Sequence, residues 1–172
     1  MLGRALALTA VSLSLVACET PNDHVHRGGA VELPGTPVTL AYLTPSGHPS
    51  GVEWNTAYVD PVRVVVRDQA AWGEAWAMLV GSEVPAAPVP SVDFTQDMVV
   101  IAGIGRSGGA RAMRMPVAAV QDDGSLRVAV EDTTLGDGCV WGPMETRQAS
   151  AARVPRADSV TFVDFVSVRK CE

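Results

Sequence analysis

The longest apolar stretch after the N-terminal segment runs from Met98 to Ile104 and carries no polar side chain. Strands with one buried face alternate apolar and polar residues, whereas a continuous apolar run is typical of a strand buried on both faces. Glycines follow this run at Gly105, Gly108 and Gly109. We therefore predict a central strand that is covered on both sides.

Shorter segments around this run have the β-branched content or the alternation of strands. They predict strands at residues 37–43, 54–58, 61–67, 111–115, 126–131, 145–154 and 160–168. The Asp-Asp-Gly sequence within Gln121–Ser125 predicts a hairpin turn just before Leu126. A long glycine-bearing loop is expected at residues 133–143.

One segment, between Asp68 and Gly81, has helical spacing. Trp72, Trp76 and Leu79 fall at i, i+4 and i+7 and form one stripe. Asp68 suits the N-cap and Gly81 the C-terminal stop. A helix covering a sheet is the simplest interpretation, and a tryptophan platform for a ligand is the alternative.

Strand patterns far outnumber the single helical one. The fold class that they predict is predominantly β (α+β): an antiparallel sheet sandwich or open barrel with one short early helix packed on it. Residues 37–172 form one β-rich domain in this interpretation. Residues 18–36 are polar and rich in glycine and proline, which predicts a flexible tether.

Residues 1–17 combine one positive charge, Arg4, with an apolar run too short to span a membrane, which predicts a signal peptide. The sequence Leu15-Val16-Ala17-Cys18 resembles the lipobox of bacterial lipoproteins, in which the cysteine is acylated and anchors the chain. An ordinary secretory signal with a chance cysteine is the alternative. We expect a lipid-anchored domain in the bacterial cell envelope, facing the periplasm or the cell surface. Glu19, where aspartate would favour the inner membrane, points to the outer membrane.

Net charge and cysteine count limit the classes of ligand and the cysteine chemistry that we expect. The net charge of -6 argues against nucleic-acid binding, for which a basic stripe would be needed. Lipidation of Cys18 leaves Cys139 and Cys171, which we expect to pair in an oxidising compartment. Two free thiols, a metal pair or a redox site are the alternatives.

No catalytic or metal constellation emerges from the sequence. His24 and His26 form an HxH pair, but with His48 they lie in tether or loop and do not supply three or four ligands in fixed geometry. We predict no metal, no cofactor and no enzyme activity. Residues 103–108 match the letters GxGxxG, yet a strand rather than a helix is expected after them, which excludes a dinucleotide site.

The order of the elements is familiar from one family. A strand, a tryptophan-bearing helix, a proline-rich link, Val92-Asp93-Phe94, the buried strand, a glycine motif and a hairpin with Asp-Gly at its tip together resemble the PrcB-like C-terminal domain. The resemblance covers Val62 to Cys171. It implies a bacterial lipoprotein domain that binds a protein, because the family is named for a subunit of a surface protease complex.

The glycine motif carries the functional part of this resemblance. Family members have the form G-x-x-x-T-G-G-Y; here Gly108 and Gly109 match, Ser107 replaces threonine and the aromatic residue is missing. A similar loop occurs in chagasin-type inhibitors of cysteine proteases. The plain alternative is a tight turn that needs two glycines. The candidate partner-binding residues are Arg106, Ser107, Gly108, Gly109, Arg111 and, in the loop that holds Cys139, Trp141.

Three functional hypotheses follow. The leading one is a non-catalytic, membrane-tethered domain that binds a protein partner, possible partners including a secreted or surface protease. The second is a ligand-binding module for a cell-wall fragment or metal that uses Trp54, Trp141 or the helix tryptophans. The third is a chagasin-like protease inhibitor.

Overall fold

The computed structural model describes residues 25–26, 30–47, 50–81, 86–109, 111–136, 138–140, 142 and 144–171. The predicted signal peptide, Cys18 and Trp141 lie outside these residues, so their roles stay predictions.

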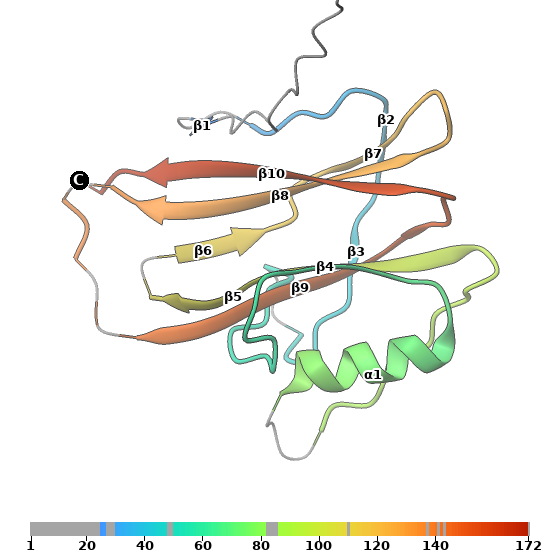
Figure 1. The fold of residues 1–172 in the computed structure, drawn as a ribbon, viewed down its shortest axis with the longest axis horizontal. Helices are drawn as coiled ribbons and strands as arrows, with labels where there is room; N and C mark the ends of the chain where they lie inside the picture. The colour runs from blue at the N-terminus through green and yellow to red at the C-terminus, as the bar shows by residue number, and fades with distance from the viewer. Residues whose placement is uncertain are drawn as a thin grey trace, which may run out of the picture.

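The described residues form one helix and two groups of strands (Figure 1). In chain order the elements are β1 (Val25–His26), β2 (Thr36–Val38), β3 (Ala41–Tyr42), β4 (Val62–Val66), α1 (Gln69–Val80), β5 (Asp97–Gly108), β6 (Arg111–Arg114), β7 (Ala118–Val120), β8 (Leu126–Leu135), β9 (Glu145–Pro155) and β10 (Val160–Arg169).

Two sheets face each other and α1 covers the outer side of one of them (Figure 1). The six-stranded sheet has the order β1-β10-β8-β7-β2, with β6 also paired to β8, and the four-stranded sheet has the order β3-β9-β5-β4. The fold is a β-sandwich with one short helix, which confirms the predicted class and selects the sandwich over the open barrel.

Strand β5 is the centre of the four-stranded sheet, as the apolar run predicted. Its side chains alternate between two hydrophobic clusters. Met98, Val100 and Ala102 belong to the cluster between the sheets. Val99 and Ile101 belong to the cluster under α1. Because both faces are covered, no polar side chain is tolerated along this part of the strand.

Gly105 interrupts this regular strand. The pairing of β5 with β9 shifts register between Gly103 and Gly105, and Gly105 has a φ of 68°. A Cβ there would lie 2.6 Å from the carbonyl carbon of Asp60. The strand needs glycine at this bulge for both conformation and space, which accounts for part of the GxGxxG letters.

The helix forms where its caps predicted. The side chain of Asp68 accepts a hydrogen bond from the amide of Ala71 at 2.9 Å, and Gly81 ends the helix with a φ of 63°. Trp72 and Trp76 are buried, and their indole N–H groups donate to the carbonyls of residues 90 and 87. The helix tryptophans are therefore core residues, which excludes them as an exposed ligand platform.

Two expectations, one about strand direction and one about a loop boundary, were wrong in detail. Strand β10 runs parallel to β8, as β1 does to β10, whereas the other pairs are antiparallel. The chain leaves β8, crosses to the other sheet as β9 and returns as β10, so β8 and β10 point the same way. The expected loop at residues 133–143 also begins later, because β8 extends to Leu135.

The expected strands at residues 37–43 and 54–58 differ as well. The first splits into β2, which pairs with β7, and β3, which pairs with β9, so the chain passes from one sheet to the other. The second contributes only an isolated bridge at Asn55. The amide of Ala57 instead donates a hydrogen bond to the carbonyl of Met78 at 2.8 Å, which holds this segment against the helix.

Two carboxylates that lie in turns make the free energy of unfolding depend on pH. Hydrogen bonds from Thr95 to Asp93 and from Ser125 to Asp123 lower the pKa of each carboxyl. A folded pKa below the unfolded value means that the unfolded chain binds more protons, so this stabilisation is present above about pH 4 and is lost as pH falls through the lowered pKa. We expect the Asp93→Asn/Asp123→Asn variant to lose less stability than the wild type on acidification.

Urea unfolding midpoints at pH 6 and pH 3 measure this difference. Asp122→Asn is the matched control and should follow the wild type. A double variant that keeps the full acid-induced drop would contradict the account.

Candidate functional site at the disulfide rim

One end of the sandwich brings together segments that are distant in the sequence. Gly108 at the end of β5 is paired with Glu145 at the start of β9. Arg111 at the start of β6 is paired with Thr134 near the end of β8. The C-terminal end of β10 lies at the same end of the molecule (Figure 1). We call this end the disulfide rim: residues 106–109, the described residues of 136–145, and residues 169–171.

A disulfide joins two of these segments. Cys139 and Cys171, 32 positions apart, are bonded with Cα atoms 5.0 Å apart. The amide of Gly136 also donates to the carbonyl of Arg169 at 2.9 Å. The predicted cysteine pairing is therefore formed, and it ties Cys139, which follows β8, to the C-terminal residues.

This connection exposes apolar side chains. Val140 is 96 % exposed and Met144 is 59 % exposed. Val168, on the adjoining end of β10, is also exposed. Single exposed apolar residues are ordinary, whereas several gathered on one end mark an interaction surface.

Some of the candidate partner-binding residues are exposed at this rim and others are buried. Arg106 is exposed and its guanidinium lies 3.6 Å from Glu145. Gly108 is exposed and Gly109 is buried. The side chain of Ser107 is buried, with its Oγ 3.3 Å from Thr146 Oγ1, and cannot reach a partner.

Arg111 is occupied within the domain. Its Nε donates to Asp132 Oδ1 at 3.2 Å and a second N–H donates to the other carboxylate oxygen. These hydrogen bonds, together with the charge of Asp132, raise the pKa of Arg111 against the opposing effect of burial. Arg111 therefore shapes the rim rather than offering a free cation to a partner.

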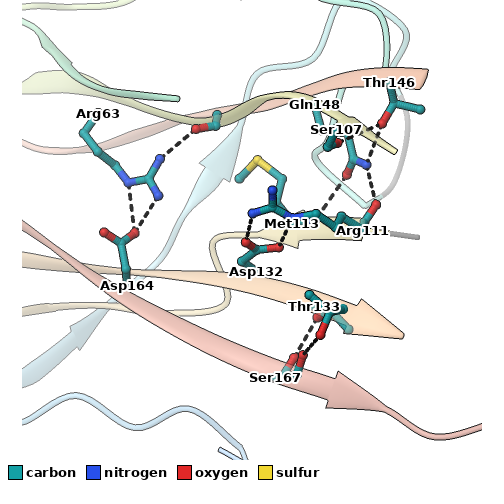
Figure 2. A network of polar contacts seen from close by, with 12 residues as sticks. Arg63, Ser107, Arg111, Met113, Asp132, Thr133, Thr146, Gln148, Asp164 and Ser167 are labelled. Atoms are coloured by element: carbon teal, nitrogen blue, oxygen red, sulfur yellow. Dashed lines mark hydrogen bonds and ion pairs between the residues drawn. The ribbon is translucent and has the colours of Figure 1, made fainter. Parts of the chain in front are cut away.

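Behind the rim lies a buried polar group that the sequence did not reveal. Gln148 on β9 is fully buried. Its Nε2 donates to the carbonyl of Arg111 at 2.6 Å and to Thr146 Oγ1 at 3.1 Å, and its Oε1 accepts from the amide of Met113 at 3.1 Å (Figure 2). The side-chain amide thus satisfies backbone groups at the edge of β6 that a neighbouring strand would otherwise bond.

A second polar bridge joins the sheets away from the rim. Arg63 on β4 donates from Nε to Asp164 on β10 at 3.0 Å and from Nη1 to the carbonyl of Gly103 at 2.8 Å (Figure 2). Between β8 and β10, Thr133 Oγ1 and Ser167 Oγ are 2.8 Å apart. The two sheets are therefore fastened by polar contacts at both Gln148 and Arg63.

A groove of about 440 Å³ opens elsewhere, between β3 and β6. Its walls include the aromatic rings of Tyr42 and Trp54, which are 39 % and 40 % exposed. Arg114 also lines the groove and donates from Nε to Glu131 at 2.6 Å. The Tyr42 hydroxyl donates to the carbonyl of Met115, and burial raises the pKa of Tyr42 while the nearby Arg114 charge opposes this shift.

Neither a metal centre nor a membrane span is present in the described part of the chain. No group of three His, Cys, Asp or Glu side chains there could hold a metal ion. No helix within the same residues is both long and apolar enough to cross a membrane. His24 and His48 lie outside the described residues.

Comparison with known proteins identifies no relative: no family model, curated protein or solved structure matches this chain. The resemblance to the PrcB-like C-terminal domain therefore stays a prediction that depends on the residues quoted for it. The fold and the two surface features define a β-sandwich with a disulfide-closed rim and a separate aromatic groove.

Proposed function

We propose that this protein is a non-catalytic, lipid-anchored module that binds a protein partner through the disulfide rim. The observation that carries the proposal is the exposure of Val140, next to the disulfide-bonded Cys139, and of Met144 in the same connection. A fixed loop loses little conformational entropy on binding, so its apolar contacts translate into affinity more fully than those of a free loop.

The charges at the rim favour an acidic partner surface. Arg106, Arg169 and Lys170 are exposed there, and Glu145 is the one exposed acid among the described rim residues. The exposed cations outnumber the exposed acid, and charges around an apolar contact steer the encounter with a partner of opposite sign. The family resemblance makes a secreted or surface protease one candidate partner.

The anchor would keep this surface close to the membrane. Cys18 precedes Val25 by seven positions, and β1 pairs with β10 at Val166 and Ser167. Seven residues span at most roughly 25 Å when fully extended. An acylated Cys18 would therefore hold the end of β10, and with it the rim, within reach of partners that are themselves bound to the envelope.

Charging the apolar rim should abolish the interaction. We expect Val140→Asp/Met144→Asp to lower partner binding by at least about tenfold, because buried anchor residues account for most of an interface's affinity. The measurement is crosslinking in intact cells from a photoreactive residue at position 106, scored as the yield of a product of one reproducible mass.

Val89→Asp is the matched control, because Val89 is also an exposed valine but lies outside the rim. Cys18→Ser, which removes the acylation site, should release the domain from the membrane and reduce the same product. If the rim variant and the Val89 variant give equal yields, the rim is not the binding surface.

A further inference from the structure

The groove between β3 and β6 is separate from the rim and has its own chemistry. Two aromatic side chains, Tyr42 and Trp54, contribute to its walls together with Val52, Met113 and Pro116. Its volume of about 440 Å³ falls within the range of small-molecule sites. It is open to solvent along one side. A ligand in it keeps part of its surface in water, which favours a molecule with one apolar face and several polar groups.

The groove does not suit an extended peptide. Peptides that add a strand to a sheet need free backbone N–H and C=O groups along an edge. Here the amide of Met113 and the carbonyl of Arg111 bond to Gln148, and the carbonyl of Met115 accepts from Tyr42. Recognition must therefore come from side chains, chiefly the faces of the aromatic rings.

One charged group completes the site. The guanidinium of Arg114 donates from Nε to Glu131, while its Nη1 and Nη2 donate to no acceptor within the described residues. Arg114 is exposed and Glu131 is buried behind it. Arginine binds carboxylates through paired N–H donors that match the two oxygens. The groove therefore has a lining group that is complementary to a carboxylate.

We propose that this groove binds a carboxylate-bearing sugar ring. A pyranose presents C–H groups on its faces, which pack on aromatic rings, and hydroxyls at its edge, which stay hydrated on the open side. Trp54 and Tyr42 hold the ring and Arg114 bonds the carboxylate. This site is independent of the rim, and its ligand is independent of the protein partner proposed above.

The test is titration of the full domain with matched sugars, followed by NMR of the Trp54 indole N–H. Two acidic probes, muramyl disaccharide and digalacturonic acid, are added up to about 10 mM, where even weak small-ligand binding is measurable. Neutral N,N′-diacetylchitobiose is the counterpart of the first probe without its carboxylate. We expect the indole resonance to shift with an acidic probe at least about fivefold more steeply than with N,N′-diacetylchitobiose.

Three variants separate the roles of the rings and the charge. Trp54→Ala, followed at the backbone amide of Arg114 because the indole signal is absent, should weaken binding of the acidic probe by about tenfold or more. Arg114→Gln/Glu131→Gln removes both charges together, so no buried carboxylate is left unpaired, and it should erase the preference for acid over neutral sugar. Glu131→Gln alone should tighten the acidic probe, because the competing carboxylate is gone.

Met78→Ala is the control, since Met78 is exposed on α1 and lines no part of the groove. The proposal is overturned if neither acidic probe shifts the indole, or if the double variant keeps the acid preference. A proline-rich peptide that shifts the indole where both sugars fail would assign the groove to a peptide instead. Rim crosslinking is unaffected by any of these outcomes, so the two proposals fail separately.

Discussion

Replacing Gln148 with leucine is expected to destabilise the domain by about 3 kcal/mol, a large part of the 5 to 15 kcal/mol typical of a domain. Leucine keeps the volume of the side chain but removes the amide that bonds the carbonyl of Arg111 and the amide of Met113. Each of these backbone groups would be left buried without a partner, at about 1 to 3 kcal/mol, and the added apolar surface offsets part of the loss. Chemical unfolding at neutral pH measures the difference.

Two further variants test the reason for this effect. Gln96→Leu makes the same exchange at an exposed position and should change stability by less than about 0.5 kcal/mol. Gln148→Glu should be less harmful at low pH, because a protonated carboxyl can donate as the amide does. Burial raises the pKa of such a carboxyl, so its stabilising form is present at low pH and is lost as pH rises.

Each variant is compared with the wild type at the same pH. Equal stability of Gln148→Leu and wild type would mean that water, not Gln148, satisfies the edge of β6.

Local pattern was enough to predict the central elements of the fold. The burial of Met98 to Ile104 on both faces, the stripe of Trp72 and Trp76, and the hairpin before Leu126 all depend on the spacing of neighbouring residues. Such spacing reports which faces of an element are covered. It is therefore readable from one sequence.

Pairing could not be predicted in the same way. Spacing does not state which strand lies beside which, so the parallel pairing of β8 with β10 was missed. For the same reason residues 37–43 read as one strand, although β2 and β3 belong to different sheets. These choices are decided by contacts between residues far apart in the chain.

The candidate site was predicted only in outline. Cys139 and Cys171 were expected to pair because of compartment and count, and the structure forms that bond. Gln148 gave no signal, because a polar residue inside a strand reads as exposed unless its partners are known. Those partners lie 35 and 37 positions away. The burial of Ser107 was hidden for the same reason, since Thr146 lies 39 positions along the chain.

Removing the disulfide is expected to lower the free energy of unfolding by roughly 3 to 4 kcal/mol at 25 °C, the chain-entropy value for a loop of this length. The bond closes a segment of 32 residue steps that contains β9 and β10. Cutting it enlarges the set of unfolded conformations and also frees Val140, next to Cys139, so rim binding should weaken together with stability. Urea unfolding of the Cys18→Ser protein, with and without reductant, measures this change in the free energy of unfolding. Cys18 is replaced so that only Cys139 and Cys171 respond to the reductant.

The Cys139→Ala/Cys171→Ala variant separates loss of the bond from other effects of the reductant. It should unfold at the midpoint of the reduced parent protein and be insensitive to reductant. Coincident midpoints for oxidised and reduced parent protein would show that the bond does not constrain the chain. A variant with reduced stability but unchanged rim crosslinking would show that the contacts between Gly136 and Arg169 position the loop without the disulfide.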